Sequence, residues 1–303
     1  MYTNILIPTD GSDYVEPAIR YGLDLARRYD ANVHALHVVD SSPLESDFDL
    51  TALETDVETL PEAWYDAGDT ATQQIASQAS ERGLGVVTEV RRGIPAREIA
   101  SYITDNGIDL VCMGTRGRTG LGRLLLGSVT TRIVRTVDRP IFSVKPKAVN
   151  AESELESERR GGFENILVPT DGSKPAREAV THGLELAQTY DATLHGLYVV
   201  DRGAYASRPG WTWNELQHGL EQDGETVLEN FQSRAASNDV PVAVELTHGV
   251  PYQEIVEYCD RHETDLVAMG THGRSGLTRQ IVGSVTERVL RSSDVPVLTI
   301  RRP

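Results

Sequence analysis

The sequence is poor in cysteine and has no long hydrophobic run. Two of its 303 residues are cysteines, Cys112 and Cys259, and we expect both thiols to be buried, as in a cytoplasmic protein without a disulfide framework. No apolar run approaches the roughly 18 residues of a membrane-spanning helix, so we expect no membrane contact. Residues 1–4 carry neither a charged nor a long apolar segment, and we expect no secretion signal.

Basic residues are scarce as well. Asp and Glu number 45 against 29 Lys and Arg, which gives a net charge of −16, and the only lysines are Lys145, Lys147 and Lys174. This balance argues against nonspecific binding of nucleic acid, because that binding needs basic groups to neutralise phosphates. An acidic chain with arginine in place of lysine indicates either a salt-rich cytoplasm or, as the alternative, a mesophile with a GC-rich genome.

Several motifs that carry chemistry are missing from the sequence. It has no G-x4-G-K-[S/T] segment and therefore no Walker phosphate loop, and no glycine fingerprint of a dinucleotide-binding fold follows the first predicted strand. It also lacks HxxxH and CxxC pairs, so we expect no bound structural metal. No repeated general base stands out, and we predict no catalytic residue.

A long internal repeat dominates what is present. Residues 4–12 return as residues 165–173, 161 positions later, and residues 113–118 return as 269–274, 156 positions later. Between 113–144 and 269–300, 16 of 32 aligned positions are identical. A repeat of this length exceeds a solenoid unit, so each copy is expected to be a domain. We predict domains at 1–147 and 164–303, joined by an acidic flexible linker at 148–163.

Short apolar runs alternate with helical patterns in each copy. In the first copy the runs predict strands at 5–7, 32–39, 86–90, 110–113 and 141–144, and the helical patterns predict helices at 15–29, 58–82, 96–106 and 128–137. Residues 41–57 are acidic and rich in turn formers, and we expect a loop there. This order predicts an α/β fold in which a parallel sheet has helices on both faces.

Two features follow the ends of predicted strands. Asp10 follows the first strand, and Gly114 begins the spacing Gly114-x2-Gly117-x9-Gly127-Ser128 after the fourth, with a second copy at 270–284. Ligands of open parallel sheets bind at the carboxyl ends of strands. Glycines and a free helix N-terminus let backbone N–H groups hold a phosphate. An ordinary helix cap is the alternative, since 284–287 also fits a capping box, but two complete copies favour the phosphate site.

These motifs resemble those of the universal stress protein family in its tandem two-domain form, and the glycine spacing resembles its ATP-binding branch. The resemblance implies two Rossmann-like domains, similar to the adenine nucleotide alpha hydrolases, each with a five-stranded parallel sheet of order 3-2-1-4-5. It also implies that aspartates contact ribose, that valines hold adenine through the backbone, and that the glycine loops wrap the phosphates. The implied cofactor-binding residues are Pro8, Thr9, Asp10, Val38, Met113, Gly114, Gly117, Arg118, Gly127, Ser128, Val129, Pro169, Thr170, Asp171, Val199, Met269, Gly270, Gly273, Arg274, Gly283, Ser284 and Val285.

The resemblance also carries expectations about function. It implies a nucleotide-responsive stress regulator that binds one adenine nucleotide per domain, with ATP as the cofactor, with or without Mg²⁺. A slow ATPase of the same fold and a nucleotide-free partner-binding protein are the alternatives. Because last strands pair edge to edge in this family, the resemblance predicts an internal pseudo-dimer through 140–144 and 296–300, and leaves a homodimer of two chains open.

His37 becomes Tyr198 in the second copy, which weakens a catalytic role for His37. The unlike loops at 41–57 and 202–214 predict unequal affinities.

Overall fold

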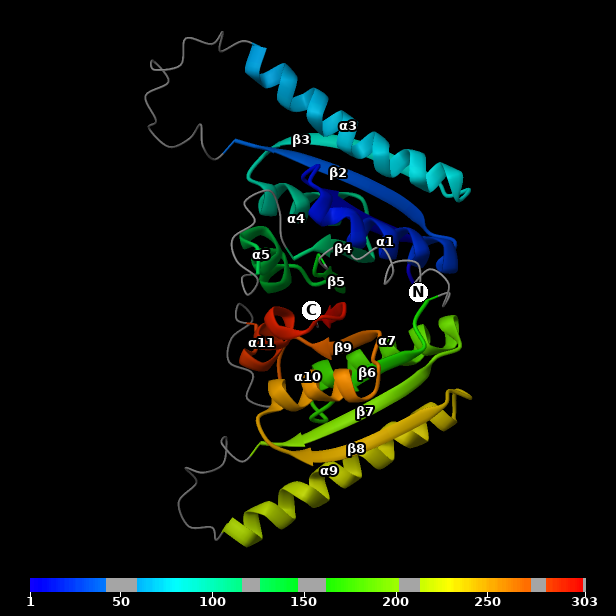
Figure 1. Ribbon diagram of the computed structural model, residues 1–303, viewed down its shortest axis with the longest axis vertical. Coiled ribbons are helices and arrows are strands. Elements are labelled where there is room, and N and C mark those ends of the chain that lie inside the picture. Colours follow the sequence, from blue (N-terminus) through cyan, green and yellow to red (C-terminus); the bar gives the residue numbers. More distant parts are fainter. Residues whose placement is uncertain (42–58, 116–125, 147–161, 202–212, 274–281, 302–303) are drawn as a thin grey trace. The chain divides into compact units, whose positions relative to one another are not determined.

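The computed structural model describes residues 1–41, 59–115, 126–146, 162–201, 213–273 and 282–301. By its contacts the chain divides into two compact units, Met1–Pro146 and Lys147–Pro303, and each of them is an α/β domain (Figure 1).

The sheet of the first domain is parallel and has the strand order β3-β2-β1-β4-β5. The order implied by the family resemblance is therefore confirmed. Its elements are β1 (Asn4–Thr9), η1 (Asp13–Val15), α1 (Glu16–Tyr29), β2 (Asn32–Asp40), α3 (Thr59–Glu81), β3 (Val86–Gly93), α4 (Pro95–Asp105), β4 (Leu110–Gly114), α5 (Ser128–Thr136) and β5 (Ile141–Val144).

The second domain repeats this plan with the order β8-β7-β6-β9-β10, again with parallel pairing. Its elements are β6 (Asn165–Pro169), α7 (Lys174–Tyr190), β7 (Thr193–Val200), α9 (Trp213–Ala236), β8 (Val242–His248), α10 (Pro251–Arg261), β9 (Leu266–Gly270), α11 (Ser284–Ser292) and β10 (Val297–Ile300). The equivalent of η1 is absent among the described residues, because α7 begins directly after Ser173, whose side chain accepts a hydrogen bond from the Ala176 N–H.

Helices cover both faces of each sheet. The chain moves outward from β1 to β3 and then back to β4 and β5, and right-handed crossovers therefore place α1 and α3 on one face and α4 and α5 on the other. Contacts between α1 and α3, and between α4 and α5, agree with this arrangement. The C-terminal ends of β1 and β4, which are hydrogen-bonded neighbours, thus open on one edge of the sheet.

The core consists of the apolar strands and the inward sides of the helices. Ile5, Leu6 and Ile7 of β1 are fully buried, as are Ile166, Leu167 and Val168 of β6. The structure confirms that Cys112 and Cys259 are buried free thiols. Desolvation raises the pKa of both, that of Cys259 to about 12, so neither thiol is a reactive thiolate near neutral pH.

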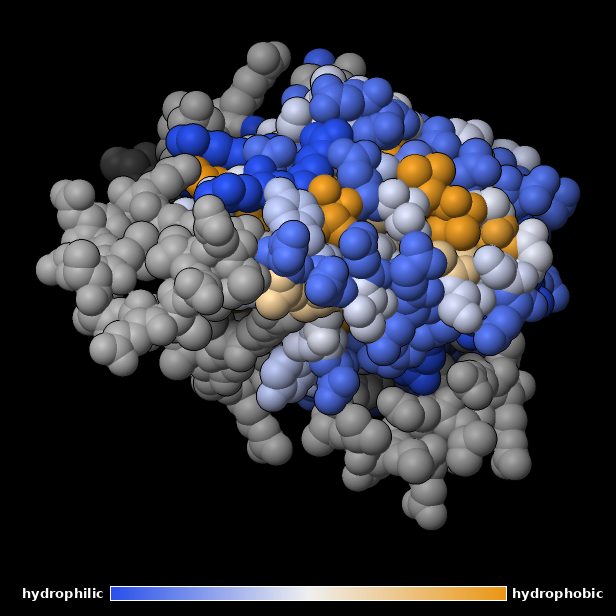
Figure 2. Space-filling model, turned by 90° about the horizontal axis from the view of Figure 1, so that it is seen from above, coloured by the Kyte–Doolittle hydropathy of each residue, from blue (hydrophilic) through white to orange (hydrophobic). Residues whose placement is uncertain are grey.

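The visible surface of the described residues is largely hydrophilic (Figure 2). Figure 2 shows a face on which the described residues are mostly hydrophilic, with a few hydrophobic groups among them. Among the described residues, no helix combines the length and the apolar character that crossing a bilayer requires.

Candidate functional site

A cavity of about 550 Å³ lies at the C-terminal ends of β1, β2 and β4 in the first domain. Its size is that of a small-molecule site. Nine of the residues expected to bind a cofactor line it, namely Pro8, Thr9, Asp10, Val38, Met113, Gly114, Gly127, Ser128 and Val129. The structure therefore brings together segments that lie more than a hundred residues apart in the chain. Gly117 and Arg118 fall outside the described residues.

The turn after β1 holds Asp10 in a fixed orientation. The backbone N–H and the hydroxyl of Ser12 donate to Oδ1 of Asp10 at 3.0 and 2.7 Å, and the N–H of Gly11 donates to Oγ1 of Thr9 at 3.0 Å. Gly11 has a φ of 75°, which favours glycine. Side chains that bond the backbone two residues on define such turns, and here the bonds orient the carboxylate at the mouth of the cavity.

The N-terminus of α5 forms the opposite wall. Gly127 is its N-cap residue and supplies no side-chain cap, and the first intrahelical bond runs from the Thr131 N–H to the Gly127 carbonyl at 2.9 Å. The Thr130 hydroxyl donates to the Gly114 carbonyl at 2.8 Å, which ties this helix to the end of β4. The positive end of the helix, with backbone donors that have no intrahelical partner, is thus part of the cavity wall and suits an anion.

The second domain repeats this frame. The Ser173 N–H donates to Oδ1 of Asp171 at 2.9 Å, and the Thr286 hydroxyl donates to the Gly270 carbonyl at 2.9 Å. A Cβ added to Gly273 would lie 2.8 Å from Oδ2 of Asp171, so the turn after β6 and the glycine loop after β9 meet here as well. Pro169, Thr170, Val199 and Met269 stand at the ends of β6, β7 and β9, whereas Arg274 lies outside the described residues.

α11 has an ordinary glycine N-cap, but Ser284 is not the cap of a capping box. Gly283 is the N-cap residue, and Ser284 is the first residue of the helix together with Val285 as the second. Oε1 of Glu287 accepts a hydrogen bond from Nη2 of Arg291 at 2.5 Å. The glycine at the cap leaves the first turn without a side-chain acceptor.

Several lining residues were not among the site residues expected from the sequence. His37, Asp40, Trp64, Pro95 and Ile99 also line the cavity, from β2, the end of β2, α3 and α4. Pro95 had a signal, since Gly-x-Pro returns at 249–251 in the second copy. Trp64 had none, because its placement depends on how α3 packs across the sheet. A Cβ on Gly68 of α3 would lie 2.7 Å from Cδ2 of His37, which shows how closely this helix approaches β2.

The same positions differ in the second domain. Tyr198, Val200 and Leu220 occupy the places of His37, Val39 and Trp64, and with Leu228 they form a buried hydrophobic cluster. Trp64 is 38% exposed whereas Leu220 is 8% exposed, so this part of the wall is more closed in the second domain than in the first. Among the described residues no group of three or more His, Cys, Asp or Glu could hold a metal ion.

Comparison with known proteins agrees with the geometry. The model of the universal stress protein family matches the chain twice, at residues 1–145 and 162–301. A universal stress protein of Mycolicibacterium smegmatis is 28% identical over 304 residues, covering 98% of this chain and 96% of that protein. One from Methanocaldococcus jannaschii is 35% identical over 142 residues, covering 46% of this chain and 84% of that protein.

A solved structure shows the same fold along the whole chain. The crystal structure of a universal stress protein from Archaeoglobus fulgidus covers 99% of this chain and 98% of its own with a TM-score of 0.72, at 21% sequence identity. Two family matches, in tandem, account for nearly all of the described elements. The chain belongs to the universal stress protein family, as a tandem of two of its domains.

Proposed function

We propose that this tandem protein binds an adenine nucleotide, ATP, in each domain and acts as a nucleotide-responsive regulator of stress survival in the cytoplasm. The observation that carries the proposal is the convergence of three elements on one cavity of about 550 Å³ in the first domain. They are the Asp10 carboxylate, the glycine at the end of β4 and the uncapped N-terminus of α5.

Each element suits one part of a nucleotide. Backbone N–H groups at a helix N-terminus and a glycine-rich segment hold phosphate oxygens. A carboxylate accepts hydrogen bonds from ribose hydroxyls, and the backbone of Val38 and the apolar Ile99 line the part of the cavity that would receive the base. We expect binding with at most slow hydrolysis, with or without Mg²⁺, because Asp10 would be engaged with ribose and His37, a lining residue that could act as a base at neutral pH, is not repeated in the second domain.

The test is a titration of the full chain with ATP, AMP and cyclic AMP by calorimetry at high salt. We expect saturable binding of ATP at two sites. Asp10→Ala should weaken the first site about tenfold or more, and Asp171→Ala the second, because each removes a charge-assisted hydrogen bond. Asp260→Ala removes an exposed carboxylate on α10 and serves as the control. Absence of uptake would show that the glycine loops are structural, and rapid turnover would favour the ATPase.

The two sites should differ in affinity. We expect the first to bind more tightly, because His37 and Trp64 line an open cavity where Tyr198 and Leu220 belong to a packed cluster. Trp64→Leu installs the residue of the second domain and should narrow the difference. Equal binding constants in Asp10→Ala and Asp171→Ala would contradict this expectation.

A pairing of the two domains through β5 and β10 is part of the proposal. Pro140 and Pro296 precede these last strands, each of which ends a five-stranded order. Edge strands expose backbone groups that can pair with another edge. A cysteine pair at Ser143→Cys and Thr299→Cys should cross-link within one chain if the edges meet, while a cross-link between chains only would replace the pseudo-dimer by a homodimer.

A further inference from the structure

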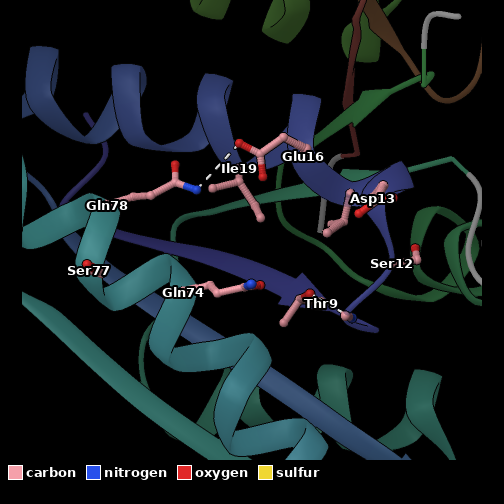
Figure 3. Close-up of a pocket in the computed structure, with 10 residues that line it drawn as sticks. Thr9, Ser12, Asp13, Glu16, Ile19, Gln74, Ser77 and Gln78 are labelled. Atoms are coloured by element: carbon pink, nitrogen blue, oxygen red, sulfur yellow. Dashed lines mark hydrogen bonds between the residues drawn. The ribbon is translucent and has the colours of Figure 1, made fainter. Parts of the chain in front are cut away.

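The helix α3 lines two cavities of the first domain with different kinds of residue. To a second cavity, of about 380 Å³ beside the start of α1, it contributes the polar Gln74, Ser77 and Gln78 (Figure 3). To the larger cavity, of about 550 Å³, it contributes Trp64 and Ala67. Residues three positions apart lie on the same side of a helix, so these two form an apolar wall. An apolar part of a ligand is therefore expected against Trp64.

The order of the strands decides which part of a nucleotide would reach Trp64. The strand β1, which ends beside Asp10, lies between β2 and β4. The N-terminus of α5 at Gly127 is tied to the end of β4, whereas α3 packs on β2 and β3. A nucleotide with its phosphates at Gly127 and its ribose at Asp10 would therefore extend its base toward the end of β2, where Trp64 lines the cavity.

The other side of this end of the cavity is apolar too. Pro95 and Ile99 of α4 line it, and α4 covers the face of the sheet opposite to α3. A planar base at the end of β2 would thus have an aliphatic side chain on one side and the indole of Trp64 on the other. Aromatic side chains in such places serve as platforms on which bases stack.

The second domain has the same helix position. A Cβ on Gly224 of α9 would lie 2.7 Å from Cδ1 of Tyr198, just as a Cβ on Gly68 of α3 would lie 2.7 Å from Cδ2 of His37. Each helix therefore approaches its strand equally closely. The residues four positions before these glycines, one helical turn earlier, consequently stand at equivalent places in the two domains.

Those two residues differ in kind and in burial. Leu220 is 8% exposed and belongs to the buried cluster with Tyr198, Val200 and Leu228. Trp64 is 38% exposed and lines the cavity. The indole therefore keeps apolar area in contact with water, and a ligand with a flat aromatic face would remove that area from water.

We propose that Trp64 stacks on the base of the nucleotide in the first domain, so that this site depends on an aromatic base. The inference rests on the proposed nucleotide binding and adds the residue that holds the base. An indole stacks on any of the bases, because each has a π face. Leu220 offers no such face, and we expect the second site to depend less on the base.

The test is calorimetric titration of the full chain carrying Asp171→Ala, in which the second site is weakened, with ATP and with inorganic tripolyphosphate, which has phosphates but no base. Trp64→Leu should weaken the binding of ATP about tenfold, the effect of losing one stacked base, and leave that of tripolyphosphate unchanged. Trp64→Phe should keep most of the affinity for ATP, because it retains an aromatic face.

The next residue on α3 supplies a matched control. Tyr65 is 37% exposed and is not among the lining residues, so Tyr65→Leu should bind ATP as the parent chain does. Unchanged ATP affinity in Trp64→Leu, an equal loss in Tyr65→Leu, or an equal loss of tripolyphosphate would each overturn the role of Trp64 while ATP binding itself stands. Absence of ATP uptake by every chain would overturn the proposed function and this inference with it. The melting temperature of each variant shows whether a loss comes from unfolding.

Discussion

The two domains contain the same buried His–Tyr pair in different surroundings. Nδ1 of His34 lies 2.9 Å from the Tyr102 hydroxyl in the first domain, and Nδ1 of His195 lies 2.9 Å from the Tyr258 hydroxyl in the second. The pair joins β2 to α4 in the first domain and β7 to α10 in the second. Desolvation raises the pKa of each tyrosine to about 12, so the hydroxyl keeps its proton and can donate.

The charged groups around this pair come from different elements. Glu89 pairs with Arg91 on the same strand at 2.5 Å, and Arg91 also lies 3.5 Å from Asp105 on α4 and 4.8 Å from the centre of the Tyr102 ring. In the second domain Glu245 pairs at 2.8 Å with Arg261, which stands on α10 at the place of Asp105.

The position of Arg91 is a threonine in the second domain, Thr247. In each domain an acidic and a basic residue pair near the tyrosine, but the basic residue stands on a different element. The position of an exposed charge is therefore weakly constrained. The buried pair, whose partners would otherwise be unsatisfied, is retained in the same geometry. At these positions the duplication preserved the buried, hydrogen-bonded pair and relaxed the charges that water can solvate.

The largest effects should come from equivalent glycines of the shared frame. A Cβ on Gly22 would lie 2.7 Å from Cδ1 of Ile7 and 3.2 Å from Cβ of Cys112, and a Cβ on Gly183 would lie 2.6 Å from Cγ2 of Val168. Overpacking at such sites costs about 1–3 kcal/mol. We expect Gly22→Ala and Gly183→Ala to destabilise their own domains by similar amounts, measured by hydrogen exchange of each domain in the full chain.

A third glycine supplies the control for this pair. A Cβ on Gly219 in α9 would meet no atom within 4 Å. Gly219→Ala should stabilise the second domain by up to about 1 kcal/mol through helix propensity. If Gly22→Ala and Gly183→Ala behave like Gly219→Ala, the close helix–strand approach is not a shared constraint.

An effect in the same range is expected from the tyrosine hydroxyls. Tyr102→Phe and Tyr258→Phe each leave a buried histidine nitrogen without its partner, at a cost of about 1–3 kcal/mol. The loss should be larger in the first domain, because Nε2 of His195 keeps a second bond to Oδ1 of Asn165 at 3.1 Å. Urea unfolding monitored by hydrogen exchange in each domain measures both. A larger loss in the second domain would contradict the idea that Asn165 holds the ring.

The smallest effect concerns pH. Burial lowers the pKa of His34 and His195 below 6.5, and nearby His262 lowers that of His195 further, whereas Glu89 opposes the lowering for His34. The neutral folded form is therefore favoured above pH 6.5, and its stability is lost as the pH falls from 6.5 through the lowered pKa of the folded protein.

In a His182→Asn chain, which removes the second-domain histidine whose pKa burial lowers to about 4, we expect the second domain to lose more stability than the first in that range, by about 1 kcal/mol or less. Hydrogen exchange of both domains at several pH values, corrected for intrinsic rates, measures the difference. His262→Gln should bring the two domains closer together. An equal loss in both domains of the His182→Asn chain would mean that His262 has no influence on His195.

Much of the frame was predictable because local patterns carry it. The apolar runs of β1, β2 and β4 and the helical spacing of α1 predicted these elements to within a few residues. The largest departure at a strand end is β3, which reaches Gly93 rather than residue 90. Pairing along the whole of β2, up to the contact of Asp40 with Gly93, lengthens β3, and that pairing has no local signal.

The site was only partly predictable, because local patterns mark some of its residues and contacts between distant segments place the others. Asp10, Gly114 and Gly127 occur in a repeated spacing, so the sequence marks them without a structure. His37, Trp64 and Ile99 line the same cavity from other elements, and Trp64 belongs to a helix that has few local constraints on its rotation. Which residues of α3 face the cavity follows from the close approach of Gly68 to His37, a contact between segments 31 positions apart.

The sequence by itself determined the duplication, the α/β order of elements, the burial of the cysteines and the glycine spacing after the fourth strand. These properties follow from composition and from periodicity within short segments. Only the tertiary structure decided which side chains complete the first cavity, and that the place of Trp64 is taken by the packed Leu220 in the second domain. Such contacts join residues distant along the chain, and close packing selects them only once the sheet and helices are assembled.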